Sequence, residues 1–476
     1  MEWRCAAAPH GHEHPDDERF DLIVDGLAAA RAPLTWGQLN IWRPLEQFGA
    51  EAHVFNGRST LTLTAPVPRA VALAAVATIV ARHAALRCHF GGEQRTAMQH
   101  ARERGSVAVA VRVATQETGA RTADELAATL AATAFDHERE WPLRLGLVEK
   151  PAGSVVAITL VSSHVALDGW ASDLVTSELE SLLAGRPLQA VAWDPLQQAQ
   201  LEHSEQGRAR TASAVRHWRS RLSTAPPRTV HAWQPSTPPV RRWAMVSTHL
   251  AVAVGAITAR TQTSTSSVLL TLAALGHCAS TGADVAALRL ISSNRFTEQQ
   301  RNLAATTAQN GLVVTPLGSD GLDTLVRRVH QEARLGYFYA AYDPRTLDDA
   351  ISEEFADRMP DAFFNDARRG DERPFTGESV RGDYAKTTMR ELAPLQWHDM
   401  AYYVRIHTRD NACMLELLAD TGRVPESTVA RLPLALEALA REFATVDMTV
   451  PDALRALGSP DPAPPPARAA PPGDAS

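Results

Sequence analysis

The sequence predicts an α/β fold built as two lobes of similar size. In both halves of the 476-residue chain, segments that alternate apolar and polar residues, as half-buried strands do, are interspersed with segments of helical periodicity. A polar, helix-like stretch at 195–222 and a proline-rich connector at 225–239 lie between the two halves. A chain of this length can bury the cores of two or three ordinary domains.

The first half carries strand and helix patterns in mixed order. Strands are expected at 59–64, 86–90, 107–113 and 155–161, and helices at 70–85, 124–134 and 171–183. This mixture indicates a first lobe at 1–190, followed by an inter-lobe helix and connector at 191–240.

The second half has a comparable rhythm. Strands are expected at 246–254, 287–291, 312–314, 402–406 and 412–418, and helices at 266–279, 322–339 and 429–443. The pattern predicts a second lobe at 241–458. The tail at 459–476 is rich in proline and alanine and is expected to be disordered, because it cannot bury a core.

Composition excludes several classes of protein. The formal net charge is −7, whereas a nucleic-acid-binding protein is usually basic. No apolar run reaches the roughly 18 residues of a membrane span, and the first residues lack the apolar core of a signal peptide. The sequence therefore predicts a cytoplasmic protein that binds neither nucleic acid nor membrane.

The cysteines and histidines do not predict a metal site. Four widely spaced cysteines form no CxxC pair, which indicates free thiols in a reducing compartment: Cys5, Cys88, Cys278 and Cys413. His10, His12 and His14 form a small cluster, but they lie in a polar segment that we interpret as an unstructured tail.

The most informative segment is the turn at 163–170. His164 lies between a strongly apolar strand pattern and a helix pattern, Asp168 follows four residues later, and Gly169 comes directly after it. A neutral imidazole on such a turn can take a proton from a nucleophile. The Asp168 carboxylate can hold the turn through a charged hydrogen bond, and Gly169 lets the backbone turn tightly. Because a His-x-x-x-Asp pair also occurs by chance, it is the strand–turn–helix context that favours catalysis.

This turn resembles the HHxxxDG signature of the condensation domains of nonribosomal peptide synthetases. Ser163 replaces the first histidine, and His164 corresponds to the second, which the family uses at the reaction centre. Further segments resemble other motifs of the family in the same order: residues 33–38 with Trp42, residues 82–87 with Phe90, residues 135–136, residues 142–144, residues 217–218, residues 293–295 and residues 311–315. Two more departures are Val314, where the family usually has asparagine, and the poorly matching stretch at 342–386.

The resemblance implies two lobes with the fold of chloramphenicol acetyltransferase, forming a V-shaped pseudo-dimer with a central tunnel. His164 would take a proton from an acceptor amine or hydroxyl, or orient it, while the acceptor attacks a donor thioester. The N–H of Gly169, near a helix N-terminus, would stabilise the oxyanion.

Three other residues are expected to be structural at the active site. The resemblance implies that Asp168 has a buried arginine partner, for which Arg82 is the first choice and Arg295 the second. Ser163 is expected to affect packing or local polarity, since no GxSxG elbow surrounds it.

The resemblance also implies the partners. The donor is expected to be a thioester on an acyl- or peptidyl-carrier protein, and the product an amide or ester in natural-product or antibiotic biosynthesis. No adenylation or carrier domain is evident, so we expect a free-standing acyltransferase that uses carrier proteins in trans. No cofactor of its own is expected, since phosphopantetheine thioesters arrive on the partner proteins.

Three alternatives stay open from the sequence. A carrier-independent acyltransferase that uses acyl-coenzyme A would usually have a DFGWG motif, which is not found. A non-catalytic platform that recruits another enzyme would not need His164. An epimerase would need a second acid/base group, and none is identified.

Overall fold

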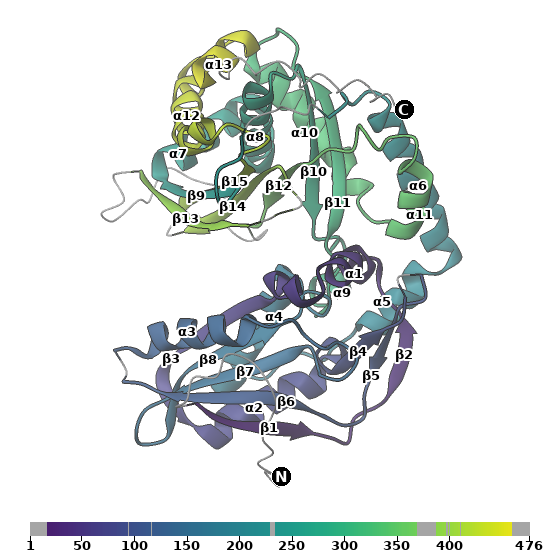
Figure 1. The fold of residues 1–476 in the computed structure, drawn as a ribbon, viewed down its shortest axis with the longest axis vertical. Coiled ribbons are helices and arrows are strands. Elements are labelled where there is room, and N and C mark those ends of the chain that lie inside the picture. Colours follow the sequence, from purple (N-terminus) through teal and green to yellow (C-terminus); the bar gives the residue numbers. More distant parts are fainter. Residues whose placement is uncertain are drawn as a thin grey trace, which may run out of the picture. The chain divides into compact units, whose positions relative to one another are not determined.

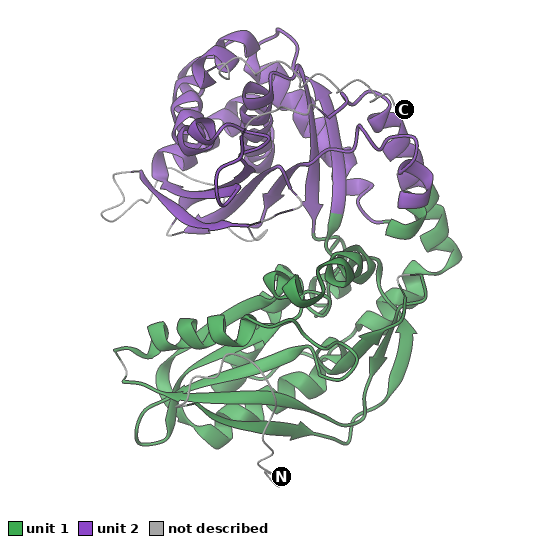
Figure 2. Ribbon diagram, viewed as in Figure 1, with its two compact units in different colours: residues 1–212, 293–309, 342–347 green, residues 213–292, 310–341, 348–476 purple. Residues whose placement is uncertain are grey.

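The computed structural model describes residues 17–93, 95–115, 117–228, 234–368, 387–396, 398, 400–409 and 411–458. The chain divides into two compact units, coloured separately in Figure 2. Unit 1 comprises residues 1–212, 293–309 and 342–347, and unit 2 comprises residues 213–292, 310–341 and 348–476. The division differs from the predicted boundaries, because two segments of the second half belong to unit 1. The tail expected to be disordered and the cluster of His10, His12 and His14 lie outside the described residues.

Unit 1 is built on a five-stranded sheet with the order β1-β6-β7-β8-β3 (Figure 1). Its strands are β1 (Glu18–Val24), β6 (Gly105–Val113), β7 (Leu143–Glu149), β8 (Ser154–Ser162) and β3 (Gly57–Pro68). β6 and β7 run parallel, and the other neighbours are antiparallel. Every residue of β7 and all but the first of β8 are buried, as in strands covered on both faces.

A three-stranded sheet and several helices complete unit 1. The sheet consists of β2 (Ala30–Pro33), β5 (Met98–Ala101) and β4 (Cys88–Gly91). The helices are α1 (Trp36–Phe48), η1 (Gly49–Phe55), α2 (Arg69–Arg82), η2 (Ala84–Arg87), α3 (Gly119–Ala131), α4 (Gly169–Leu183), α5 (Pro195–Glu202) and α9 (Glu298–Arg301). α3 packs closely on the large sheet because β7 has a glycine there: a Cβ on Gly146 would lie 2.8 Å from Leu126 of α3.

Unit 2 contains a seven-stranded sheet with the order β11-β10-β12-β14-β15-β9-β13. The strands are β11 (Gln309–Pro316), β10 (Val285–Ser292), β12 (Ala362–Asp366), β14 (Tyr402–Arg409), β15 (Ala412–Asp420), β9 (Val240–Ser247) and β13 (Thr388–Leu395). β10, β12 and β14 are parallel, whereas β14, β15, β9 and β13 form an antiparallel series. Alternate residues of β14 are buried, so this strand presents one face to the core.

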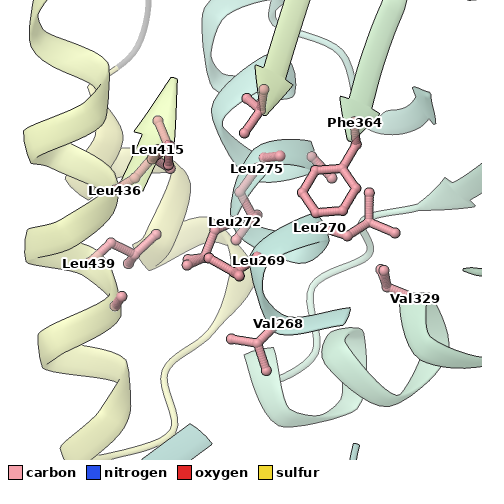
Figure 3. Packing of buried hydrophobic residues seen from close by; sticks show 14 of the residues in the cluster. Val268, Leu269, Leu270, Leu272, Leu275, Val329, Phe364, Leu415, Leu436 and Leu439 are labelled. Atoms are coloured by element: carbon pink, nitrogen blue, oxygen red, sulfur yellow. The ribbon is translucent and has the colours of Figure 1, made fainter. Parts of the chain in front are cut away.

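The helices of this half of the chain are α6 (Glu205–Leu222), α7 (Thr248–Thr261), α8 (Thr265–Thr281), α10 (Leu322–Phe338), α11 (Pro344–Ile351), α12 (Glu426–Thr445) and α13 (Val450–Leu457). Among them, α7, α8, α10 and α12 contact strands of the sheet, and α13 packs on α8 and α12. α8 is the central helix, because 13 of its 17 residues are buried. In Figure 3, Leu272 of α8 faces Leu436 and Leu439 of α12, whereas Leu270 lies beside Phe364 of β12.

The strand predicted at 246–254 is wrong. The chain leaves β9 at Ser247, whose hydroxyl caps α7 by accepting a hydrogen bond of 2.9 Å from the N–H of Leu250. The buried side chains of Leu250, Val254 and Ile257 then recur at helical spacing. The N-cap and the helical spacing of these buried residues favour a helix more strongly than the alternation of valine and alanine in the same stretch favours a strand.

No helix within the described ranges is long and apolar enough to cross a membrane.

Candidate active site

The predicted strand–turn–helix is confirmed at 163–168. β8 ends just before the turn and α4 begins just after it, with Asp168 as the N-cap residue of α4. The Ser163 carbonyl accepts hydrogen bonds from the N–H groups of Ala166 at 3.0 Å and Leu167 at 3.2 Å. These bonds close the turn that carries His164.

The carboxylate of Asp168 is buried, with only 4% of the residue exposed, and it is fully engaged. Its Oδ1 accepts from the N–H of Ala171 and from the guanidinium of Arg295, both at 2.9 Å. Its Oδ2 accepts from the N–H groups of Thr307 at 3.0 Å and Ala308 at 3.2 Å. Burial raises the pKa of this carboxyl, but the charge of Arg295 and the hydrogen bonds outweigh burial, so its pKa lies below the usual range. Asp168 is therefore an ionised side chain that ties the turn to the 305–308 segment.

Arg295 lies in the 293–309 segment, which the second half of the chain contributes to unit 1. Its side chain is 1% exposed. One terminal nitrogen donates to the carbonyls of Gln300 and Leu303, both at 2.7 Å, and the other donates to the carbonyl of Ala305 at 2.7 Å. The guanidinium carbon also lies 5.9 Å from the ring centre of Trp170. The segment therefore wraps around the guanidinium and presents it to Asp168.

The expectation that Arg82 is the first partner of Asp168 is wrong. Arg82 ends α2 and binds Glu178 of α4, with contacts of 2.8 and 3.1 Å, and it also donates to the carbonyl of Gln189. His83 binds the same carboxylate at 2.6 Å. Glu178 lies ten residues after Asp168, which is about 15 Å along a helix. Arg82 therefore fixes the packing of α2 on α4, and the second choice, Arg295, contacts Asp168.

His164 is partly exposed, unlike the residues on either side of it. Its Nδ1 atom is buried and has no hydrogen-bond partner among the described residues. Since Nδ1 is enclosed, Nε2 is the nitrogen that can meet a substrate. The His164 carbonyl accepts a hydrogen bond of 2.5 Å from the hydroxyl of Thr306, and the Thr306 carbonyl accepts one of 3.1 Å from Thr35, the N-cap of α1. The backbone that carries the imidazole is thereby linked to a second helix start.

Gly169 is the first residue of α4, and it is exposed. A Cβ at this position would meet nothing within 4 Å. It is not among the glycines with positive φ, so the expectation that Gly169 serves a tight turn is wrong. Because the first N–H groups of a helix lack acceptors within the helix, the N–H of Gly169 is a donor that α4 itself does not satisfy.

The Ser163 hydroxyl contacts a histidine that the sequence did not indicate. Ser163 is 1% exposed, and its Oγ lies 2.7 Å from Nε2 of His137. His137 directly follows the Phe135–Asp136 pair that resembles a family motif, but nothing in its spacing to Ser163 signalled the contact. Thr306 and Thr307 were missed for the same reason, since both approach the turn from more than 130 residues further along the chain.

Other titratable groups have structural surroundings. The guanidinium of Arg87 donates to the carbonyls of Ala28 at 2.7 Å and Arg102 at 3.0 Å rather than to the turn at 163–168. Burial raises the pKa of three cysteine thiols to about 12, which keeps them protonated: Cys88, Cys278 and Cys413. Over the residues that the structure describes, no three His, Cys, Asp or Glu side chains gather as a metal site would require.

Unit 2 contains a cavity of about 70 Å³ beside the start of β12 and β14. Its cationic side chains are already engaged within unit 2. Arg358 and Arg228 donate to backbone carbonyls, and Arg423 pairs with Asp361 at 3.4 Å. The cavity therefore does not offer free charges for a ligand.

The fold and the turn define a two-unit α/β protein in which the partly exposed imidazole of His164 lies on a strand-to-helix turn that a buried ion pair holds in place. The condensation-domain family model matches residues 29–344, and the chain belongs to the condensation-domain family. The resemblance noted from the sequence is thus confirmed. Members of this family form amide or ester bonds by acyl transfer in natural-product biosynthesis and act on substrates bound to carrier proteins.

Two curated relatives are large synthetases. The chain is 28% identical over 238 residues to an isonitrile lipopeptide synthase of Mycobacterium tuberculosis, a match that covers 46% of this chain and 9% of the relative. It is 29% identical over 212 residues to CymA of Salinispora arenicola, which is named as a probable non-canonical nonribosomal peptide synthetase; this match covers 41% of this chain and 3% of the relative. The match therefore spans less than a tenth of each relative.

Solved structures share the fold. The condensation domain of the monacolin K polyketide synthase MokA superposes with a TM-score of 0.72 at 15% identity, covering 88% of this chain and 99% of that one. SgcC5 of Streptomyces globisporus gives a TM-score of 0.67 at 18% identity, covering 87% and 98%. The mixed α/β fold expected from the sequence is confirmed by these likenesses.

Proposed function

We propose that this protein transfers an acyl group from a carrier-protein thioester to an amine or hydroxyl acceptor, forming an amide or an ester. The observation that carries the proposal is a partly exposed His164 on a turn that Asp168 and Arg295 hold rigid. A positioned general base of this kind contributes roughly 10²–10⁴-fold to a rate.

The reaction balances with the groups that the turn offers. The acceptor nitrogen or oxygen forms a bond to the thioester carbonyl carbon, and the carbon–sulfur bond breaks. His164 takes the proton from the acceptor through Nε2 and returns it to the departing sulfur, so that a thiol leaves. Because Nδ1 is enclosed, the imidazole can exchange protons with a substrate on one side only.

Gly169 supplies the second part of the site. The oxygen of the tetrahedral intermediate carries negative charge, and an N–H at the start of a helix stabilises an anion. A Cβ on Gly169 would meet nothing within 4 Å, so a carbonyl can approach this residue from that side. Asp168 does not compete for this donor, because its carboxylate binds Ala171, Thr307 and Ala308 instead.

Acyl- or peptidyl-carrier proteins acting in trans would deliver the donor on a phosphopantetheine thiol. The carrier supplies the thioester, so the protein needs no bound cofactor of its own for this reaction. Holding two substrates together accounts for a further large share of the rate, since orientation alone is worth up to about 7–11 kcal/mol.

Mass spectrometry of acyl-loaded carrier proteins tests the proposal. The protein is mixed with a loaded carrier and with an amine or an alcohol acceptor in turn, and loss of the acyl group from the carrier is matched to a new amide or ester. Wild-type protein is expected to form one of these products and His164→Ala to form it far more slowly. His249→Ala, on the partly exposed surface of α7, is the matched control.

Two outcomes of the same experiment contradict the proposal. Equal product with acyl-coenzyme A and no carrier would indicate a carrier-independent acyltransferase. Product formation at the wild-type rate by His164→Ala would indicate a platform that recruits another enzyme.

A further inference from the structure

The residue before His164 is tied to a different part of unit 1. The N–H of Ser163 donates to the carbonyl of Pro142 at 3.1 Å, and its own carbonyl accepts the two hydrogen bonds that close the turn. Its hydroxyl, 2.7 Å from Nε2 of His137, is the remaining polar group. Ser163 is 1% exposed whereas His164 is partly exposed, so the two neighbouring side chains point in different directions.

His137 is held in an aromatic setting between α3 and β7. Its ring lies edge-on to Trp42 at 5.6 Å and to Phe90 at 6.3 Å, and it is tilted against Phe135 at 6.3 Å. The backbone carbonyl of His137 accepts a hydrogen bond of 2.8 Å from the N–H of Phe90. The imidazole is therefore fixed by packing as well as by the hydrogen bond to Ser163.

This serine–histidine pair has the distance of a nucleophile and its base, but its surroundings exclude that role. Burial lowers the pKa of His137 to about 4, a shift that the charge of Arg144 reinforces and that of Asp136 opposes. General-base catalysis is most effective when the pKa lies near the working pH, so this imidazole is a weak base. The Ser163 hydroxyl is also too buried to reach a substrate.

We infer that His137 is a positioning residue for His164, acting through the Ser163 hydroxyl. The neutral imidazole of His137 anchors residue 163 on one side of the turn, and Thr306 anchors the His164 carbonyl on the other. Ser163 occupies the position of the first histidine in the family signature, and in this chain its hydroxyl is paired with the imidazole of His137 from another segment. The effect of this positioning on catalysis rests on the proposed function, in which His164 is the general base.

Side-chain swaps that preserve volume test this inference. His137→Phe keeps an aromatic ring among Trp42, Phe90 and Phe135 but loses the hydrogen bond, and Ser163→Ala loses it from the other side. His137→Gln keeps a polar group at the end of the side chain. His89→Gln changes another partly exposed histidine of unit 1 and is the matched control.

Because one partly buried hydrogen bond is lost, we expect kcat to fall about three- to tenfold in His137→Phe and in Ser163→Ala, with KM unchanged. The double variant should lose no more than either single variant, since both remove the same contact. His137→Gln should retain most of the rate. Losses that multiply in the double variant, or a wild-type kcat in His137→Phe, would overturn the inference.

Imidazole nitrogen signals of His164, followed by nuclear magnetic resonance without substrate, separate this inference from the proposed function. We expect them to move in His137→Phe and Ser163→Ala and to stay in place in His89→Gln. Unchanged His164 signals in both hydrogen-bond variants refute the positioning role, whatever the activity. A protein that transfers no acyl group but shows these shifts refutes the proposed function alone.

Discussion

Replacing Asp168 removes one member of the buried ion pair that anchors the active-site turn. Asp168→Ala leaves the Arg295 guanidinium, whose side chain is 1% exposed, without a carboxylate. It also leaves the N–H groups of Thr307 and Ala308 without their acceptor and removes the N-cap of α4. Breaking a buried pair in this way costs about 3–5 kcal/mol in the free energy of unfolding.

Thermal unfolding followed by circular dichroism measures this loss. In a domain of 150–250 residues each kcal/mol shifts the midpoint by about 2–4 °C, so we expect unit 1 to unfold about 6–20 °C lower, or Asp168→Ala to accumulate as insoluble protein. Asp168→Asn keeps an acceptor and the volume, so it provides a soluble intermediate case. Asp124→Ala, on an exposed site of α3, is the control and should change stability by less than about 0.5 kcal/mol.

The pH dependence gives a second reading of the same pair. The pKa of Asp168 is lowered in the folded state, so its contribution is present above the unfolded pKa of about 3.9 and is lost as pH falls through the folded value. The difference in the free energy of unfolding between the wild type and Asp168→Asn should therefore disappear below about pH 4.

A soluble, fully active Asp168→Ala protein with an unchanged thermal unfolding midpoint would contradict the role given to this ion pair.

Three further predictions concern other parts of the chain. Gly169→Ala should leave the unfolding midpoint unchanged or slightly raised, because its Cβ meets nothing within 4 Å, yet slow single-turnover transfer about tenfold or more, because that Cβ enters the space where a carbonyl would bind. Equal rates would contradict this. Burial raises the pKa of Glu202, whose carboxylate accepts a hydrogen bond from the N–H of Trp36, to about 7. Between about pH 4.3 and pH 7 the folded state keeps a proton that the unfolded state releases, so the free energy of unfolding of the wild type should fall over this range relative to that of Glu202→Gln. If the two free energies of unfolding change with pH in parallel, this prediction is wrong. Leu272→Ala, in the core of unit 2, should cost about 2–5 kcal/mol, seen as faster hydrogen exchange in α8 and α12 but not in β7 or β8; unchanged exchange in α8 would contradict it.

Local patterns predicted the elements around the site because they depend on near neighbours. The apolar run at 155–161 became β8, and the helix expected at 171–183 became α4, since strand burial and helix capping are set within a few residues. The stretch at 246–254 failed because valine and alanine alternate there, while the N-cap at Ser247 decided in favour of α7.

Contacts between distant segments could not be predicted in the same way. The choice between Arg82 and Arg295 depends on which guanidinium the fold brings to Asp168, and Arg295 is 127 residues away along the chain. The contact between His137 and Ser163 spans 26 residues and two strands of the sheet, and no periodicity encodes it. The predicted unit boundaries differ from those of the structure because the sequence does not show which unit a segment packs against. The segment that supplies Arg295 follows β10 in the sequence but belongs to unit 1.

The most direct measurement of the central claim is the single-turnover rate of acyl transfer from a loaded carrier by His164→Ala, beside the wild type and His249→Ala. Loss of the general base should lower the rate about 10²–10⁴-fold while the unfolding midpoint stays at the wild-type value, and His249→Ala should match the wild type in both. A folded His164→Ala protein that transfers the acyl group as fast as the wild type would contradict the claim that this imidazole does the chemistry.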